Sequence, residues 1–451
     1  MVTESDTVVA TAAPVDTASP TSVISARRVP SVLARPVADR RLVAEVQPLV
    51  DALPGASCVS ISGPAGQMLA RDDDTPLAPA SNAKLLTGFA ALQVLGPDTT
   101  FETTLAAQRA PVDGVVDGDL WMVGGGDPLL STAPYRSRVK YGDLMPATPL
   151  ESVADAVVAA GVRRVSGRVV GDESRYDAVR AVPTWPARYQ ADGQVGALSA
   201  LGVNDGRQFA AIEGGTSPGG VDAEPAAGAA KALVELLRSR GVTVDGGAAS
   251  GTAPAERVSV ATVRSLTVRE IVGELLEFSD NTTAELLVKE MGVAAGKGGT
   301  TEAGLAVLRS TLEQAGLPTD GLVLVDGSGL DRADRVSCAT LDALLEHTGP
   351  DGPIEDGLPV AGTSGTLVDR YTRSVAKGKV RAKTGSLRDV TSLSGWVTTD
   401  PGAQLSFAIV VNTPDRQVTN DDILATQRIT EALLSYPATP DLAALGPVVG
   451  P

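Results

Sequence analysis

Three short motifs carry side chains that together could perform nucleophilic catalysis. They are SNAK at residues 81–84, SDN at 279–281 and KTGS at 383–386. A serine hydroxyl is a weak nucleophile until a neighbouring base accepts its proton. A lysine amine can be that base if burial or nearby cations lower its pKa. The chain therefore contains both partners of a serine–lysine nucleophile, with further hydroxyl, amide and ammonium groups to bind a substrate.

The first motif can bring its two reactive groups together. Residues three positions apart lie on one face of a helix, so the hydroxyl of Ser81 and the amine of Lys84 can meet. Ser81 also stands where a helix is expected to begin, and free N–H groups at a helix N-terminus stabilise a developing oxyanion. Taken alone, these four residues also describe a capping serine followed by a solvated lysine, so the interpretation depends on the other two motifs.

The second motif falls between two expected helices. There the hydroxyl of Ser279 could pass a proton between Lys84 and a leaving nitrogen. The amide of Asn281 could hold both Lys84 and a substrate amide. The alternative role of this motif is a helix cap, because Ser or Asp before a helix satisfies free N–H groups.

The third motif ends a predicted edge strand. Lys383 supplies positive charge there, and Thr384 and Ser386 supply hydroxyl donors. Gly385 is expected to leave space for a substrate backbone beside the strand. Together these groups suit a terminal carboxylate, although the same residues could form an ordinary solvated strand end.

Hydrophobic patterns and turn residues place the motifs on regular elements. Helices are expected over 41–54 and 81–95, on both sides of 279–281, and over 304–316 and 423–437. The stretch SCVSISGPAGQMLARDD predicts two strands around a tight turn. Near the end, VRAKTGS, SLSGWVTT and QLSFAIVVN predict three more strands, and the last two are expected to form an antiparallel hairpin.

Composition changes along the chain divide it into segments. Residues 1–40 are rich in Ala, Thr, Ser, Pro and Val without periodicity and predict a flexible leader, and residues 438–451 predict a flexible tail. Between them, the region around 105–261 has strand-like runs broken by Asp-Gly turns. A helix followed by a strand is indicated twice there, in ESVADAVVAAGVRRVSGRVVGD and in AAKALVELLRSRGVTVDGG. We interpret 105–261 as an inserted domain.

Charge and composition exclude several classes of function. The net charge of −16 argues against nucleic acid, which requires clustered Lys and Arg. His347 is the single histidine and lies near the end of an expected helix, so neither a His-rich metal site nor a Ser-His-Asp triad is expected. No run of 18 apolar residues predicts a membrane span, and the N-terminus does not resemble a signal peptide.

Cys58 and Cys338 could form a disulfide in an oxidising compartment or be two small buried apolar residues.

The three motifs in this order are the set found in β-lactamases and penicillin-binding proteins. The chain most resembles the class C low-molecular-mass penicillin-binding proteins, the D-alanyl-D-alanine carboxypeptidase/endopeptidase family of peptidase S13 type. The stretches FSDNTTAELLVKEMG, VDGSGLDR, LPVAGTSGTL and AKTGSL also fit that family. Ser81 and Ser279 are much further apart than in compact β-lactamases, and a large insertion between them is typical of the family.

The resemblance implies an α+β fold of the penicillin-recognising serine transpeptidase/β-lactamase type. Its antiparallel sheet, flanked by helices, would be assembled from 41–104 and 262–437, with a mostly-β insertion at 105–261. The penultimate D-alanine carbonyl of a peptidoglycan stem peptide would acylate Ser81, and the oxyanion would lie between the backbone N–H groups of Ser81 and Ser386. Water would then release the peptide. β-Lactam antibiotics would acylate the same serine and leave slowly.

The resemblance further implies an extracytoplasmic protein that needs no metal or cofactor, and it leaves carboxypeptidase and endopeptidase action both open. The absence of a signal peptide is attributed to truncation. Two features depart from the family pattern, namely Ser386 where relatives often have Thr, and Arg388-Asp389 where smaller residues are expected. These departures leave the side-chain specificity of the site open.

Two other functions are compatible with the same motifs. A β-lactamase would need an efficient deacylating base, such as a Glu-held water. No glutamate between Asn281 and Lys383 lies in a recognisable motif, although Glu285, Glu290 and Glu302 are present. A non-catalytic cell-wall-binding protein could keep the fold, with the insertion binding glycan or another protein.

Overall fold

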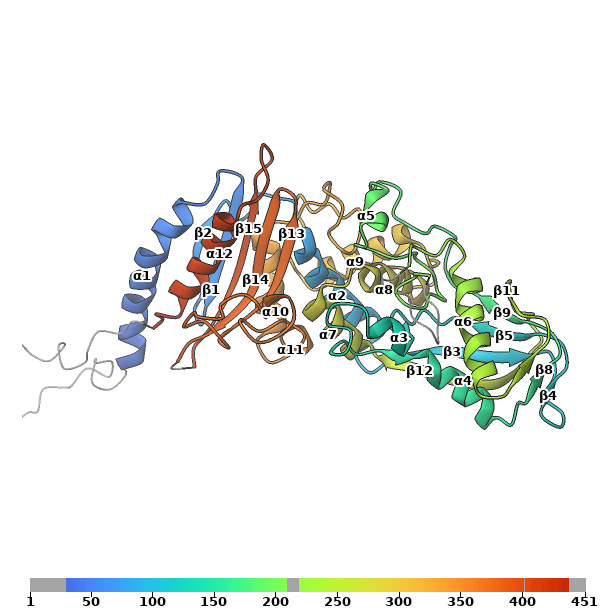
Figure 1. Ribbon diagram of the computed structural model, residues 1–451. Coiled ribbons are helices and arrows are strands. Elements are labelled where there is room, and N and C mark those ends of the chain that lie inside the picture. The colour runs from blue at the N-terminus through green and yellow to red at the C-terminus, as the bar shows by residue number, and fades with distance from the viewer. Residues whose placement is uncertain (1–29, 209–218, 401, 438–451) are drawn as a thin grey trace, which may run out of the picture.

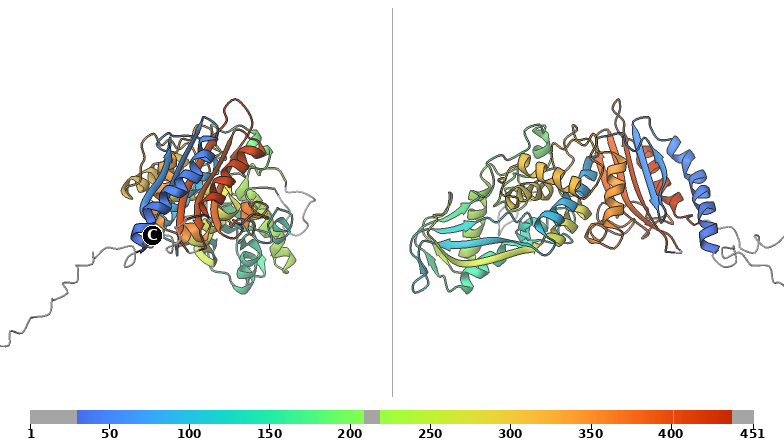
Figure 2. Two further views of the ribbon diagram at one scale, coloured as in Figure 1. Left: turned by 90° about the vertical axis from the view of Figure 1, so that its left-hand side faces the viewer. Right: turned by 180° about the vertical axis from the view of Figure 1, so that it is seen from behind.

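The computed structural model describes residues 30–208, 219–400 and 402–437. Figure 1 shows an elongated molecule with an antiparallel sheet between helices at one end and a second group of strands and helices at the other. A cluster of helices lies between these two ends, as the views in Figure 2 also show. We call the sheet and its surrounding helices the main domain, and the segment from β3 to β12 the insertion.

The main domain is built on a five-stranded antiparallel sheet in the order β13-β14-β15-β1-β2. Its strands are β1 (Ser57–Gly63), β2 (Gly66–Arg71), β13 (Val380–Leu387), β14 (Val390–Thr398) and β15 (Gln404–Asn412). The predicted strands and hairpins are therefore confirmed. Because β1 pairs with β15, the two halves of the discontinuous domain share one sheet.

Two helices, α1 (Pro30–Asp51) and α12 (Asn420–Leu433), cover the outer face of this sheet. The buried residues Ala38, Leu42, Val46 and Val50 recur every four positions along α1, which is the spacing of one helix face. The predicted flexible leader is therefore wrong over residues 30–40, because this apolar stripe begins before Arg41. Residues 1–29 and the predicted tail at 438–451 lie outside the described residues.

The other face of the sheet packs against a group of helices, three of which carry or flank the first two motifs. These helices are α2 (Ala83–Leu95), α7 (Val268–Phe278), α8 (Asn281–Ala294), α9 (Thr301–Gln314) and α10 (Cys338–Thr348), with the short helix α11 (Pro353–Asp356) and the 3-10 turn η2 (Gly365–Leu367). Side chains from all five long helices and from β1, β14 and β15 form one buried apolar cluster. Helix α2 is buried along most of its length, so its position is determined by its neighbours on several sides.

Two buried links join β1 to α10. Cys58 and Cys338 form a disulfide with sulfurs 2.06 Å apart and Cα atoms 5.8 Å apart, so the first of the two alternatives for these cysteines is the one observed. Beside it, the carboxylate of Asp342 accepts hydrogen bonds of 2.7 Å from three serine hydroxyls, those of Ser60, Ser62 and Ser406. The disulfide partners are 280 positions apart, so this bond connects the two halves of the main domain across the insertion.

The insertion contains a five-stranded mixed sheet in the order β11-β9-β5-β3-β12 and a three-stranded parallel sheet in the order β10-β8-β4. The strands of the first sheet are β3 (Thr100–Ala107), β5 (Leu120–Val123), β9 (Val169–Asp172), β11 (Ala248–Ser250) and β12 (Val258–Thr267). The second comprises β4 (Val115–Val116), β8 (Arg164–Val165) and β10 (Thr243–Val244), and a further short pair joins β6 (Leu130–Ser131) to β7 (Thr148–Pro149).

Helices α4 (Leu150–Ala159) and α6 (Pro225–Ser239) pack on these sheets, and α3 (Ala133–Arg136) and α5 (Arg188–Ala191) are single turns. The helix–strand order predicted twice is confirmed, as α4 followed by β8 and as α6 followed by β10. Strands β3 and β12 pair with each other where the chain enters and leaves the insertion. The proposed domain limits at 105 and 261 lie within this ladder.

His347 occupies the structural position that the sequence predicted. It lies in the last turn of α10, with its ring edge-on to Phe89 at 5.5 Å between ring centroids.

Among the described residues, no helix combines the length and the apolar character that a membrane span requires.

The disulfide generates a stability prediction. Replacing both cysteines by alanine should lower the free energy of unfolding by about 2–5 kcal/mol, because the bond closes a very long loop in the unfolded chain. Urea unfolding measures this difference, and the reduced wild-type protein, as the matched control, should unfold like the variant. Two free thiols in the oxidised, denatured wild-type protein would contradict the assignment.

Candidate active site

Ser81 lies in a 3-10 turn, η1 (Ala80–Asn82), which leads directly into α2. Two hydrogen bonds fasten this turn to β14: Asn82 Nδ2 donates to Ser394 Oγ at 3.0 Å, and Ser392 Oγ donates to the carbonyl oxygen of Pro79 at 2.7 Å. Ala80 has a left-handed backbone conformation with φ of 48°, which L-residues seldom adopt. The surroundings of the turn therefore hold the nucleophile in one place.

The amine of Lys84 is fully buried and lies at the centre of the site. Its Nζ donates to Ser81 Oγ at 3.0 Å, to Asn281 Oδ1 at 2.6 Å and to the carbonyl oxygen of Ser328 at 2.7 Å. The predicted meeting of Ser81 and Lys84 is thus present in the structure. All three acceptors are neutral oxygens, so no carboxylate contacts the amine directly.

Burial lowers the pKa of Lys84 to about 8, because removal from water disfavours the charged form. The carboxyl groups of Asp326, Glu285, Asp280 and Glu274 oppose this shift through their negative charge, and the desolvation effect is larger. At neutral pH part of the protein population therefore carries the unprotonated amine. This is the form of Lys84 that can accept the Ser81 proton.

Two residues of the second motif, Asp280 and Asn281, have different roles. Asp280 caps α8 by accepting a hydrogen bond from the backbone N–H of Thr283 at 2.8 Å, so the cap that was the alternative interpretation is present. Asn281 connects Lys84 to the insertion, because its Nδ2 donates to the carbonyl oxygen of Gln194 at 2.6 Å while its Oδ1 faces Lys84. A structural role for Asp280 and a role at the site for Asn281 therefore coexist in this motif.

Ser279 ends α7 in a left-handed conformation with φ of 64°. Its hydroxyl makes no hydrogen bond within the described part of the chain, so the structure does not bring it into contact with Lys84. The proton-relay role expected of this hydroxyl therefore stays a prediction.

The third motif lies on the edge strand β13, facing η1. Lys383 is fully buried, its Nζ donates to the carbonyl oxygen of Thr384 at 2.9 Å, and burial together with the charge of Lys84 holds its pKa well below the usual value. Thr384 donates from its hydroxyl to Thr366 of η2 at 2.8 Å. An anionic ligand would supply the counter-charge that Lys383 lacks.

Gly385 has a role that the sequence did not indicate. A Cβ at this position would lie 2.1 Å from Ser392 Oγ and 2.9 Å from the carbonyl oxygen of Pro79. The missing side chain therefore makes room for the nucleophile turn to approach the sheet, and the space it creates is filled by protein. That a substrate backbone lies beside the strand at this position stays a prediction.

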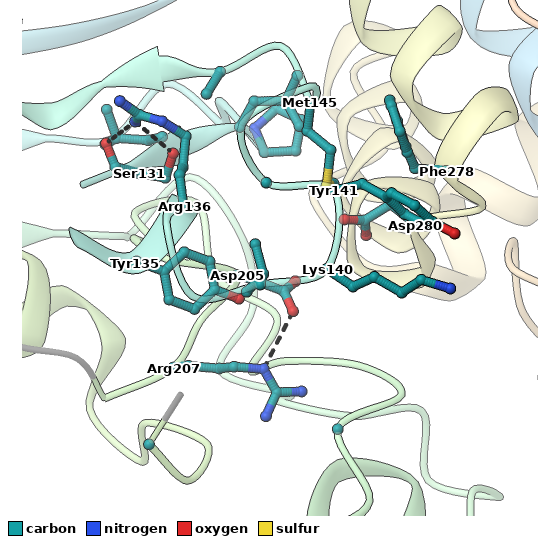
Figure 3. Close-up of a pocket in the computed structure, with 18 of the residues that line it drawn as sticks. Ser131, Tyr135, Arg136, Lys140, Tyr141, Met145, Asp205, Arg207, Phe278 and Asp280 are labelled. Atoms are coloured by element: carbon teal, nitrogen blue, oxygen red, sulfur yellow. Dashed lines mark hydrogen bonds and ion pairs between the residues drawn. The ribbon is translucent and has the colours of Figure 1, made fainter. Parts of the chain in front are cut away.

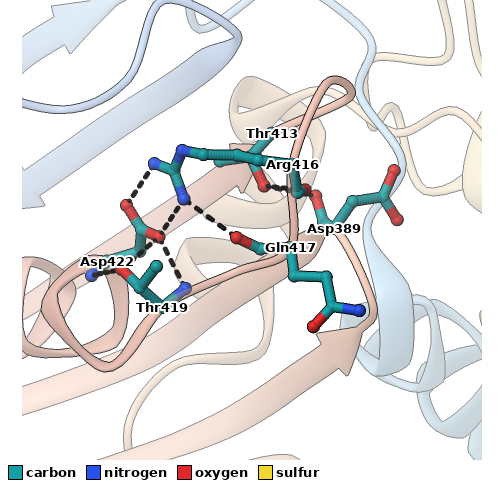
Figure 4. A network of polar contacts seen from close by, with 6 residues as sticks. All are labelled: Asp389, Thr413, Arg416, Gln417, Thr419 and Asp422. Atoms are coloured by element: carbon teal, nitrogen blue, oxygen red, sulfur yellow. Dashed lines mark hydrogen bonds and ion pairs between the residues drawn. The ribbon is translucent and has the colours of Figure 1, made fainter.

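The exposed Ser386 and the following residues lead into the β13–β14 turn. From Lys383 to Leu387 the outer edge of β13 has no backbone partner within the described residues, so an extended peptide can add there. Asp389, unexpected at this place in the family, is mostly buried and forms an ion pair with Arg332. The backbone of Asp389 is held as well, because its carbonyl oxygen accepts a hydrogen bond of 2.8 Å from the N–H of Thr413. Figure 4 shows these two residues.

A cavity of about 800 Å³ lies beside the second motif, between α7–α8 and the insertion. As Figure 3 shows, Phe278 and Asp280 form its main-domain wall, and Tyr141, Lys140 and Arg207 approach from the insertion. Arg207 pairs with Asp205 at 3.3 Å. The cavity is therefore lined by aromatic rings and by charges of both signs.

The loop that follows α9 carries site residues that the sequence did not identify. Asp326 is fully buried and accepts hydrogen bonds from the backbone N–H groups of Ser328, Gly329 and Asp331 and from the indole of Trp185. Glu285 accepts from the N–H groups of Gly327 and Ser328. The only available signal was the glycine-rich stretch VDGSGLDR, which marks a tight loop but does not say what the loop binds.

The glutamates considered for a deacylating base are placed unfavourably. Glu285 lies buried beneath the loop at 325–331, Glu290 pairs with Arg175, and Glu302 is in the first turn of α9.

Among the described residues, no three His, Cys, Asp or Glu side chains form a group that could hold a metal ion.

Comparisons with known proteins agree with this geometry. A family model described as the D-Ala-D-Ala carboxypeptidase 3 (S13) family matches residues 55–223 and 221–433. A D-alanyl-D-alanine carboxypeptidase of Actinomadura sp. (strain R39) is 33% identical over 422 residues, covering 77% of this chain and 75% of that protein. Carboxypeptidase DacB of Mycolicibacterium smegmatis is 33% identical over 350 residues, covering 75% and 72%.

Solved structures agree on the fold. Penicillin-binding protein 4 (dacB) of Haemophilus influenzae superposes with a TM-score of 0.70 at 20% identity, covering 86% of this chain and 98% of that one. A second structure of that protein, complexed with a β-lactam, gives a TM-score of 0.64. From the matched family model and the relatives at 33% identity, we conclude that this chain belongs to the D-Ala-D-Ala carboxypeptidase (S13) family, as its motifs indicated.

Proposed function

We propose that this chain is a serine DD-peptidase that hydrolyses D-alanyl-D-alanine bonds of peptidoglycan stem peptides through an acyl-enzyme on Ser81. The observation that carries the proposal is the buried amine of Lys84, 3.0 Å from Ser81 Oγ, with its pKa lowered to about 8. This pair supplies a base for a serine nucleophile without any histidine.

In the first half of the reaction, neutral Lys84 accepts the proton of Ser81 as Oγ attacks the carbonyl carbon of the penultimate D-alanine. The oxyanion of the tetrahedral intermediate lies between the backbone N–H groups of Ser81 and Ser386. Collapse of this intermediate breaks the peptide bond, and the leaving nitrogen takes the proton from Lys84, directly or through the hydroxyl of Ser279. Water then attacks the ester, which releases the shortened peptide and restores Ser81.

The substrate carboxylate is assigned to the third motif. Lys383 is buried and contacts no carboxylate among the described residues, and Thr384 and Ser386 add hydroxyl donors beside it. An incoming carboxylate stabilises the charged form of Lys383 and so raises its pKa, which means that binding and protonation reinforce each other. This arrangement favours peptides that end in a free carboxylate over neutral analogues.

The relatives at 33% identity are named carboxypeptidases, which supports the release of a terminal D-alanine. Endopeptidase action on cross-linked peptides is the second candidate, because a solved endopeptidase of Bdellovibrio bacteriovorus shares the fold at a TM-score of 0.52. A β-lactamase is less well supported, since none of its three candidate glutamates is free at the site. β-Lactams are therefore expected to acylate Ser81 and to leave slowly.

The proposed location is extracytoplasmic, where peptidoglycan is found. The disulfide between Cys58 and Cys338 supports this location, because such bonds persist in oxidising compartments and are rare in the cytosol.

The nucleophile assignment predicts the fate of penicillin. Ser81→Ala should abolish covalent labelling by fluorescent penicillin, because no other described serine has its hydroxyl within hydrogen-bond distance of a lysine amine. Labelling on gels and intact mass spectrometry measure the adduct, with Ser310→Ala on the surface of α9 as a control that should label fully. An adduct retained at another residue of the Ser81 variant would contradict the mechanism.

The base assignment predicts a pH dependence. The fraction of neutral Lys84 grows as pH rises through about 8, so the acylation rate should climb about tenfold per pH unit below that value and level off above it. Stopped-flow acylation between pH 6 and 9.5 gives this profile. A Lys84→Ala variant should acylate more slowly by several orders of magnitude, and normal acylation by that variant near neutral pH would show that Lys84 is not the base.

The carboxylate assignment predicts a selective loss. Lys383→Ala should lower the acylation efficiency of a carboxylate-bearing peptide ester by about 10- to 100-fold, the value of one charge-assisted hydrogen bond. The same ester with its carboxylate amidated should change much less. Equal losses for both esters would remove Lys383 from carboxylate binding.

A further inference from the structure

One segment of the insertion reaches both main-domain groups that hold the amine of Lys84. Apart from Ser81 Oγ, that amine bonds to Asn281 Oδ1 and to the carbonyl oxygen of Ser328. The segment at 184–194 lies between β9 and α6 and includes α5. At one end it contacts the loop that carries Ser328, and at the other end it contacts Asn281.

The contact with the loop is made by Trp185. Its indole N–H donates to Asp326 Oδ2 at 2.8 Å, and this hydrogen bond is buried. The ring itself is 8% exposed and belongs to an apolar cluster that includes Leu286 of α8 and Leu330 of the loop. Trp185 is therefore anchored on the main domain by apolar packing and contributes one directed polar contact.

Asp326 determines the shape of the loop. Its Oδ1 accepts from the N–H groups of Ser328 and Gly329 at 3.1 and 2.6 Å, and its Oδ2 accepts from the N–H of Asp331 at 2.7 Å. Each of these bonds fixes a peptide unit of the turn, and the peptide after Ser328 carries the carbonyl that faces Lys84. Without the Trp185 N–H, Oδ2 of this buried carboxylate would lose one of its donors and keep the N–H of Asp331, with the Asp334 carboxyl hydrogen-bonded to the same side chain.

The second contact is made by the backbone at the other end of the segment. The carbonyl oxygen of Gln194 accepts from Asn281 Nδ2 at 2.6 Å. Since an amide that donates through Nδ2 on one side presents Oδ1 on the other, this bond orients Asn281 toward Lys84. The main domain alone therefore does not determine the positions of both acceptors.

We propose that Trp185 is a positioning residue for acylation, acting through Asp326 and the Ser328 carbonyl on Lys84. The inference rests on the proposed function and extends it, because it makes the insertion part of the catalytic arrangement. The indole N–H of Trp185 is directed at Asp326 and not at Ser81, so we expect its removal to affect the acylation step. A displacement of reacting groups by about 1 Å is enough to slow a reaction by about 100-fold.

The test is Trp185→Phe, which removes the indole N–H and keeps an aromatic ring. Stopped-flow labelling with fluorescent penicillin, over a range of concentrations, separates the acylation rate constant from the dissociation constant. We expect the rate constant to fall about 10- to 100-fold, with an unchanged dissociation constant and one label per chain at completion. Trp121→Phe, the same change on β5 of the insertion, is the matched control and should acylate like the wild-type protein.

A merely structural role gives a different result. Partial unfolding would lower the number of labels per chain and the thermal midpoint while the labelled fraction reacted at the wild-type rate, and that outcome would overturn the inference. If the Phe variant does not fold, incorporation of β-(3-benzothienyl)alanine at position 185 removes the N–H with almost no change in shape, and a wild-type rate constant there would also overturn it. Failure of the wild-type protein itself to label would instead overturn the proposed function, and the inference with it.

Discussion

The burial of one lysine amine is the constraint on which the rest of the site depends. Lys84 loses its water and receives three neutral oxygens in exchange, from Ser81, Asn281 and Ser328. Four carboxyl groups lie close enough to favour its charge, yet desolvation outweighs them and brings its pKa to about 8. Any of those carboxylates in direct contact would favour the ammonium and leave Ser81 without a base. The site therefore depends on keeping the nearby acidic groups out of direct contact with the amine.

Three separate parts of the chain meet this requirement. The sheet holds the nucleophile turn through Ser392 and Ser394, and it allows a close approach because residue 385 has no side chain. The loop at 325–331 uses its own buried carboxylate to fasten its backbone N–H groups, which leaves a neutral carbonyl facing Lys84. The insertion orients Asn281 through a backbone carbonyl. The disulfide and the shared sheet hold the two halves of the main domain together across the insertion.

Much of this was predictable from the sequence, for physical reasons. Motif order, helix starts and strand alternation gave the main sheet, the nucleophile helix and the meeting of Ser81 with Lys84. The packing of the nucleophile turn against Gly385 was not foreseen, because a sequence does not reveal that the Pro79 carbonyl approaches from 306 positions away. Asp326, Trp185 and Gln194 were missed for the same reason: their roles depend on contacts between distant segments, and one of them acts only through its backbone. The start of α1 was misplaced because Ala, Pro and Val without clear periodicity also describe a linker.

The central claim is that burial alone makes Lys84 a base near neutral pH. Nuclear magnetic resonance of protein labelled with ¹³C at the lysine ε-carbons tests it most directly, with the Lys84 signal assigned by its absence from a Lys84→Arg variant. The account predicts that this signal titrates near pH 8, well below the lysines on the surface. A Lys84 signal that stays in its charged position up to pH 10 would contradict the account, because the amine could not then accept the Ser81 proton under working conditions.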